Sequence, residues 1–206
     1  PREQEKRKLW YSHNALEWTR PLIFCDPENG WHEIVPPDVL ECTSDLARHW
    51  EFLLRVGVFW GGEMDDDRVV EPTFNIPYVY NESDWGMHET KVGGESGGSF
   101  TWDAPLKNYD DLDKLRFPEI VIDYDASHEL VKLANDTFGD MLEVRRRTAW
   151  WWSMGLTLVL ANLRGMEQIM YDMADRPDDL HRLMAFIRDG YLVKLDFLER
   201  EGLLNL

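Results

Sequence analysis

The stretch Gly155-Leu-Thr-Leu-Val-Leu-Ala-Asn-Leu-Arg-Gly165-Met-Glu-Gln-Ile-Met-Tyr-Asp-Met-Ala-Asp175-Arg-Pro-Asp-Asp-Leu180 carries the strongest structural pattern of this 206-residue sequence. Apolar residues recur every three or four positions on both sides of Gly165, which predicts two short helices with a break or bend there. Asp175-Arg-Pro predicts the start of a third helix, because an acidic cap and an early proline suit a first turn. The apolar stripe of this third helix runs through Leu180, Leu183, Met184, Ile187, Tyr191, Leu195 and Leu198, and Gly202 ends it.

Upstream of this stretch, short apolar runs alternate with amphipathic segments. The runs typical of buried strands are residues 22–25, 69–74 and 141–147, and a further strand is expected from Leu203. The segments that predict helices are residues 2–19, 44–56 (with Gly57 as the stop) and 125–138. This alternation indicates a parallel α/β sheet, and an eight-fold barrel needs about 250 residues or more. We therefore expect residues 1–206 to be the N-terminal part, roughly half, of a single TIM-type (β/α)8 barrel domain.

Residues 75–108 differ from the rest of the chain, because they combine aromatics, glycines and charges without a long period. A connection of this length in a compact domain is usually functional or mobile. It predicts a β-hairpin of Glu89–Val92 against Ser99–Trp102, across the glycine pairs at 93–94 and 97–98.

Composition restricts the class of protein and of partner. The chain has 39 acidic and 22 basic residues and a formal net charge of -17. Such a field repels nucleic acid, and it disfavours a substrate with many carboxylates unless a local basic pocket overrides it. Two cysteines suggest no secreted disulfide framework, and no apolar run approaches the roughly 20 residues of a spanning helix. We expect a cytoplasmic protein with a small-molecule substrate and without nucleic-acid or membrane partners.

The order of motifs resembles the uroporphyrinogen decarboxylase superfamily. The similar features are Gly155, an apolar helix, Gly165-Met-Glu, Asp172-Met, Asp175-Arg-Pro and a long helix. Upstream, Asp103-Ala-Pro-Leu-Lys followed by Asp110-Asp-Leu-Asp-Lys-Leu115 resembles the passage of a proline and an acidic helix in the same proteins. The resemblance runs through most of the chain, and it implies a barrel enzyme whose site lies at the C-terminal ends of the strands.

One departure from the family pattern bears on the reaction. Decarboxylases of this superfamily follow the first strand with an arginine-rich loop that grips carboxylates, whereas Cys25–Glu33 here contains no arginine. Carboxylate recognition favours guanidinium groups, so the resemblance implies corrinoid-linked methyl transfer from a small methyl donor. The corrinoid would be carried by a partner protein, and the ligands of any zinc would lie outside this chain. The alternatives are a tetrapyrrole decarboxylase, and an inert half-barrel that serves as a structural or assembly unit and forms a homo-oligomer.

Three candidate site residues follow the expected first strand. Cys25, Asp26 and Glu28 would lie at its C-terminal end, with Asp26 and Glu28 as catalytic groups and Cys25 against the substrate. The alternative is a small buried cysteine and two carboxylates that only shape a turn. Cys25, His32 and Cys42 match no compact zinc spacing, so no metal site is predicted.

The other candidates carry guanidinium, imidazole or aromatic groups. Arg147, beside the tryptophans at 150–152, could hold a carboxylate or phosphate of the ligand, or could pair internally with Glu143 or Asp140. Trp151 would reach the cleft while its neighbours pack in the core. Trp85 and His88 would form a lid or an aromatic wall over a flat ligand; the alternative is a hydrophobic cluster beneath the long connection.

Overall fold

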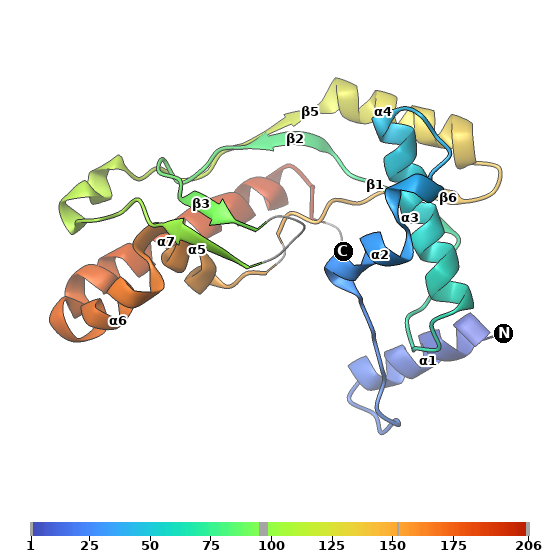
Figure 1. Cartoon of the computed structure of the whole chain (residues 1–206), viewed down its shortest axis with the longest axis horizontal. Coiled ribbons are helices and arrows are strands. Elements are labelled where there is room, and N and C mark those ends of the chain that lie inside the picture. Colours follow the sequence, from blue (N-terminus) through green and yellow to red (C-terminus); the bar gives the residue numbers. More distant parts are fainter. Residues whose placement is uncertain (1, 95–98, 152, 205–206) are drawn as a thin grey trace. The chain divides into compact units, whose positions relative to one another are not determined.

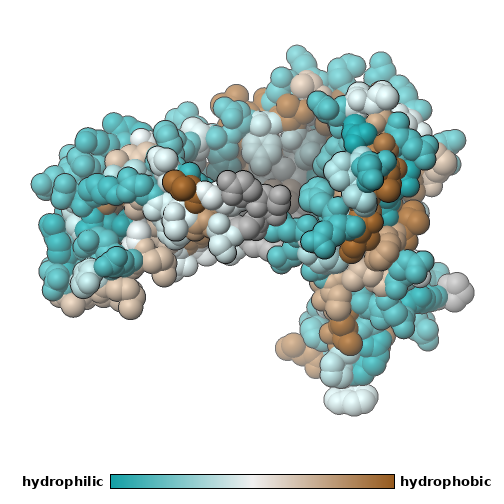
Figure 2. Space-filling model, in the orientation of Figure 1, coloured by the Kyte–Doolittle hydropathy of each residue, from teal (hydrophilic) through white to brown (hydrophobic). Residues whose placement is uncertain are grey.

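Residues 2–94, 99–151 and 153–204 are described by a computed structural model, whose elements are drawn in Figure 1. The chain divides into two compact units, Pro1–Pro72 and Thr73–Leu206. Within the described residues, no helix combines the length and the apolar character needed to cross a membrane. The surface in Figure 2 is largely hydrophilic, with hydrophobic residues in separate patches.

The first unit is helical. Its elements are α1 (Arg2–Asn14), η1 (Glu28–Gly30), α2 (Trp31–Ile34), η2 (Pro37–Val39) and α3 (Asp45–Gly62). The Ser44 hydroxyl accepts a hydrogen bond from the Ala47 amide and so caps α3, which begins one residue after the predicted start at residue 44. The predicted stop at Gly57 is wrong, because α3 continues to Gly62 and thereby buries Trp60 against Trp31, with ring centroids 4.9 Å apart.

The predicted first strand, Leu22–Cys25, is also wrong. Its backbone bonds to buried carboxylates rather than to a strand: the Ile23 amide donates to Asp67 Oδ2 at 2.8 Å, and the Cys25 amide donates to Asp66 Oδ2 at 3.1 Å. Hydrogen bonds from the Arg20 guanidinium lower the pKa of Asp67 to about 2, so this carboxylate stays charged and keeps its partners. The backbone groups that a strand would pair are thus already satisfied.

The second unit contains every strand of the described chain. In the parallel sheet, β1 (Thr73–Ile76) pairs with β6 (Glu143–Arg146). In the two antiparallel sheets, β2 (Val79–Glu82) pairs with β5 (Ile120–Asp123) and β3 (Thr90–Gly93) pairs with β4 (Phe100–Asp103). The predicted hairpin of the long connection is confirmed as β3 and β4, while Gly97 and Gly98 lie outside the described residues.

The prediction of half a (β/α)8 barrel is wrong. A half-barrel needs several parallel strands side by side in one sheet, whereas the described strands form three separate two-stranded sheets and only one of these is parallel. The physical reason lies in the long segment between β1 and α4 (Tyr124–Phe138), whose strands pair antiparallel with one another. The result is a small α/β fold rather than a repeated β/α unit.

The remaining elements of the second unit follow the sequence pattern closely. They are η4 (Tyr109–Lys114), α5 (Leu156–Arg164), α6 (Met166–Asp175) and α7 (Pro177–Arg200). The predicted break at Gly165 is confirmed: its φ of 84° lies in the region that favours glycine, and it separates α5 from α6. The helix start is confirmed too, with Pro177 in the first turn of α7, but the predicted acidic cap is wrong: Asp175 ends α6, and Arg176 precedes α7 without a side-chain cap hydrogen bond.

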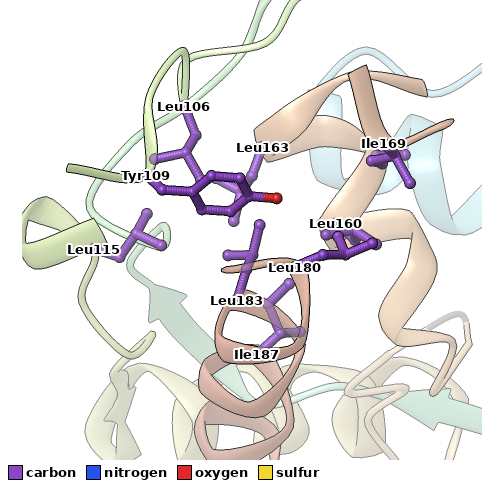
Figure 3. Packing of buried hydrophobic residues seen from close by; sticks show 10 residues of the cluster. Leu106, Tyr109, Leu115, Leu160, Leu163, Ile169, Leu180, Leu183 and Ile187 are labelled. Atoms are coloured by element: carbon purple, nitrogen blue, oxygen red, sulfur yellow. The ribbon is translucent and has the colours of Figure 1, made fainter. Parts of the chain in front are cut away.

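The core of the second unit lies where α5, α6 and α7 meet the segment around η4. Figure 3 shows its buried side chains converging, among them Leu106, Tyr109, Leu163, Leu183 and Ile187. A buried ion pair crosses this core: Arg164 Nε donates to Asp172 Oδ2 at 2.6 Å, and the Tyr109 hydroxyl donates to the same oxygen at 2.7 Å. Burial alone would raise the pKa of Asp172, but hydrogen bonds from Arg164, Gln168 and Tyr109 lower it to about 2.

Candidate functional site

The parallel pair β1–β6 brings two chain segments to one edge of a sheet. Thr73 is opposite Glu143 and Ile76 is opposite Arg146, so both strands reach their carboxyl ends together. The ladder extends one step further, because the Arg147 amide donates to the Ile76 carbonyl at 3.0 Å. In α/β sheets, ligands bind at the carboxyl ends of parallel strands, so the residues that follow β1 and β6 are the place to look for a site.

A cavity of about 460 Å³ lies at this edge. Its walls come from β1, from the loop after β6 and from the segment after α7, namely Asn75, Arg147, Thr148, Ala149, Trp150, Trp151 and Leu204. The structure therefore brings together two of the residues that the sequence singles out, Arg147 and Trp151. The cavity combines one guanidinium group with aromatic rings, which is the composition of many small-molecule sites.

The three consecutive arginines differ in what they bind. The Arg145 guanidinium pairs with Glu143 at 2.6 Å and lowers the pKa of that carboxyl. Arg146 donates to the Ser127 carbonyl at 3.0 Å, and its guanidinium lies 4.8 Å from the centroid of the Tyr78 ring. Arg147 is exposed, and its guanidinium has no hydrogen-bond or ion-pair partner among the described residues. Internal pairing with Glu143 thus falls to Arg145, and Arg147 is left available for a ligand.

Trp150 forms a fixed wall of the cavity. Its ring packs against Tyr78 and Tyr80, with centroids 6.1 and 4.8 Å away, and its Nε1 donates to the Leu203 carbonyl at 3.0 Å. Only 6% of Trp150 is exposed, whereas Trp151 is half-buried. Both rings line the cavity, the buried Trp150 as part of the core and Trp151 with more of its surface exposed; Trp152 lies outside the described residues.

Lys194 of α7 holds the loop that carries these side chains. Its ammonium group donates to both carboxylate oxygens of Glu82 and to the Trp150 carbonyl, each at 2.9 Å. Lys194 is only 9% exposed, and these three acceptors use all three donors of its buried ammonium group. The loop after β6 is consequently anchored to both α7 and β2, which limits its freedom at the cavity.

Sequence reasoning missed two residues of the site, Asn75 and Thr148. The Thr148 hydroxyl accepts a hydrogen bond from the Tyr78 amide at 2.7 Å, and so it joins the loops that follow β6 and β1. A polar Asn75 between the buried Phe74 and Ile76 was the available signal, but the predicted strand ended at residue 74. Asn75 and Thr148 come together at the cavity only because β1 pairs with β6, and the sequence does not reveal that pairing.

The structure places Cys25, Asp26 and Glu28 in the first unit, without a strand before them. Asp26 Oδ1 accepts hydrogen bonds from the Trp31 indole at 2.8 Å and from the Glu28 amide at 2.9 Å, which is the geometry of a side-chain-stabilised turn. Glu28 has a φ of 51°, and Cys25 is exposed rather than buried. For Asp26, whose carboxylate accepts both hydrogen bonds, these contacts agree with the turn-forming alternative.

The structure places Trp85 and His88 in the second unit, away from the lining of the cavity. Trp85 packs against Phe186 and Tyr191, with centroids 6.2 and 5.8 Å away, and joins the core cluster of the unit. His88 is exposed beside Asp84, with its Nδ1 3.4 Å from a carboxylate oxygen. The contacts of Trp85 agree with the alternative of a hydrophobic cluster beneath the long connection.

No cluster of three or more His, Cys, Asp or Glu side chains within the described residues has a geometry that could hold a metal ion. Asp66 and Asp67, in the acidic run at 65–67, are buried hydrogen-bond acceptors for the backbone of the first unit. In comparisons with known proteins, no family model, curated protein or solved structure matches the chain.

Proposed function

We propose that the cavity at the carboxyl ends of β1 and β6 binds a small organic ligand through one anionic group, and that the protein is an enzyme of methyl transfer acting on that ligand. The observation that carries the proposal is the guanidinium of Arg147, which has no partner among the described residues and lines a cavity of about 460 Å³ together with Trp151. A guanidinium group recognises a carboxylate or a phosphate with two parallel hydrogen bonds, and a ring beside it offers an apolar surface to the rest of the ligand.

The engagement of the neighbouring arginines supports a ligand with one anionic group rather than many. Arg145 and Arg146 are held by Glu143 and by Ser127, so only Arg147 of the run lines the cavity. The formal net charge of -17 opposes any further carboxylates on the ligand. A tetrapyrrole with several carboxylates therefore fits this cavity less well than a small methylated acid does.

The choice of methyl transfer rests on two features of the sequence. The order of motifs from Gly155 to the end of α7 resembles the uroporphyrinogen decarboxylase superfamily, and Cys25–Glu33 lacks the arginines with which its decarboxylases hold carboxylates. In this proposal the ligand held by Arg147 is the methyl donor, and the corrinoid acceptor arrives on a partner protein. Arg147 fixes the donor by its anionic end, while Trp150 and Thr148 hold the cavity wall in place. The described residues do not form a zinc site, so no step is assigned to that metal.

A methyl-transfer assay with the chain and free cob(I)alamin tests the proposal. A panel of small O-, N- and S-methylated carboxylates and phosphates serves as donors, and the rise of methylcobalamin is followed by absorbance. Arg147→Ala is expected to weaken donor binding by about 10- to 100-fold, which corresponds to the roughly 1.5–3 kcal/mol of a charged hydrogen bond. The matched control is Arg145→Ala, because that side chain pairs with Glu143 and does not line the cavity.

Two results would contradict the proposal. If no donor of the panel transfers its methyl group, the proposed reaction is wrong. If the two arginine variants lose equal donor affinity, Arg147 does not bind the donor. Turnover of uroporphyrinogen in a parallel assay would instead establish a decarboxylase.

A further inference from the structure

A second concave surface of the second unit runs along β4. This groove, of about 540 Å³, is lined by Phe100–Asp103 of β4 and, among others, by Met166, Glu167 and Tyr171 of α6. Side chains of successive strand residues point to opposite faces, so a groove that touches all four residues of β4 follows the edge of the strand. That edge has no strand partner within the described chain, because β4 pairs only with β3.

The strand is held firmly beside the helices. The Trp102 indole donates to the Ala161 carbonyl at 3.1 Å, and three residues after the strand ends the Leu106 amide donates to the Leu163 carbonyl at 2.9 Å. A strand edge that is fixed next to a helix leaves backbone N–H and C=O groups open to an incoming chain. Extended peptides bind such edges by adding a strand, with their side chains in pockets on either face.

The side chains of the groove indicate what the incoming peptide carries. Phe100, Met166 and Tyr171 are 45%, 58% and 57% exposed, and so present apolar surface to solvent, although the Phe100 ring also lies 5.9 Å from the ring of Trp102. Methionine adapts its shape to different apolar partners. We therefore expect a peptide bound in the groove to place apolar side chains against these residues.

The charges of the groove leave one carboxylate uncompensated. Asp103 pairs with Lys107 at 2.5 Å, and the Arg164 guanidinium is buried against Asp172. The carboxylate of Glu167 has no ion-pair partner among the residues that the structure describes. The groove therefore offers a single free negative charge on a protein whose formal net charge is -17.

From this combination we propose that the groove between β4 and α6 docks an extended segment of a partner protein that alternates basic and apolar residues. The backbone of the segment pairs with the open edge of β4, a basic side chain faces Glu167, and apolar side chains cover Phe100 and Tyr171. A second copy of this chain is disfavoured as the occupant, because two copies would each bring a net charge of -17. The proposal is independent of the cavity at Arg147.

Fluorescence anisotropy with labelled hexapeptides tests the docking. The probe is Lys-Val-Lys-Val-Lys-Val, and the controls are Glu-Val-Glu-Val-Glu-Val and the basic peptide with N-methyl groups on alternate backbone nitrogens. We expect the basic peptide to bind, and both controls to bind at least about ten-fold more weakly, because one loses the charge and the other loses the backbone donors.

Two protein variants locate the peptide. Glu167→Lys is expected to weaken the basic peptide about five-fold, the scale of an exposed charge pair. Glu129→Lys, on the exposed side of α4, changes the net charge equally but lies outside the groove, and is expected to leave binding nearly unchanged. Thermal unfolding of both variants confirms that they remain folded.

The proposal is overturned by absence of binding at millimolar peptide, by equal binding of the N-methylated peptide, or by equal losses in the two variants. Self-association of the chain in sedimentation experiments that the basic peptide reverses would assign the groove to a second copy, and would overturn the proposal as well.

Discussion

Two arginines of the second unit, Arg164 and Arg147, show how differently the same side chain can be used. Arg164 is buried, and its guanidinium donates to Asp172 and to the carbonyls of Leu106 and Lys107. Arg147 is exposed at the end of β6, with no partner for its guanidinium among the described residues. Because a buried charge must be compensated within the protein whereas an exposed one need not be, the first is needed for folding and only the second is available to a ligand.

The largest expected effect comes from breaking the buried pair. Arg164→Met leaves the Asp172 carboxylate buried without its cation, and we expect a loss of about 3–5 kcal/mol in the free energy of unfolding. Urea denaturation measures this loss. The double variant Arg164→Met with Asp172→Leu removes both charges and is expected to recover a large part of the stability; no recovery would show that the packing of these side chains, rather than their charge, is what matters.

The pH dependence of stability sharpens the same contrast. Asp172 has a folded-state pKa of about 2, below its ordinary value of 3.8. A lowered pKa contributes stability above the unfolded-state value, and this contribution, about 2 kcal/mol, is lost as the pH falls from about 4 towards 2. Urea denaturation at a series of pH values should show a smaller loss over this range in Asp172→Asn than in the unmodified chain. An identical loss in the two proteins would show that protonation of Asp172 does not cause the fall in stability.

The packing of Trp85 gives a smaller effect. A Cβ at Gly190 of α7 would approach the Trp85 ring to 2.5 Å. We expect Gly190→Ala to destabilise the protein by about 1 kcal/mol, because the steric cost exceeds the gain in helix propensity. Gly57→Ala is the control: nothing lies within 4 Å of its added Cβ, so that variant should be slightly more stable. If both alanines stabilise the protein, Trp85 is not packed against α7 and a lid role becomes open again.

The smallest expected effect on stability is at Arg147. Arg147→Ala should change the free energy of unfolding by less than about 0.5 kcal/mol, as is usual for an exposed side chain without partners. Thermal and urea unfolding measure this value beside that of Arg164→Met. A loss of more than about 1 kcal/mol would show that Arg147, like Arg164, stabilises the fold and is not free to bind a ligand.

The accuracy of sequence-based prediction differs along the chain for a physical reason. From Gly155 to Arg200 the helices, the break at Gly165 and the start at Pro177 are all confirmed, because periodicity, glycine and proline act within a few residues. The strand prediction for Leu22–Cys25 is wrong, because Asp66 and Asp67, some forty residues later, take its backbone hydrogen bonds. An apolar run shows that a segment is to be buried, but it does not show which groups will satisfy its backbone.

The candidate site divides in the same way. Arg147 and Trp151 were identified from residue type and position in the chain, whereas Asn75 and Thr148 enter the cavity only through the parallel pairing of β1 with β6. Cys25, Asp26 and Glu28 were predicted on the premise of a strand that does not form. The predictions of strand order failed, because strand order is set by contacts between residues far apart in sequence.

By itself, the sequence determined the helices of the second unit, the hairpin β3–β4, the strongly acidic surface and the presence of an arginine beside a tryptophan run. Only the tertiary structure decided that the described strands form three small sheets instead of half a barrel, that Arg145 and Arg146 are engaged, and that the Arg147 guanidinium has no partner in the described part of the chain. Helix signals and net charge arise from neighbouring residues and from composition. Strand pairing and the choice of ion-pair partner arise from long-range contacts, and one local sequence is compatible with several of them.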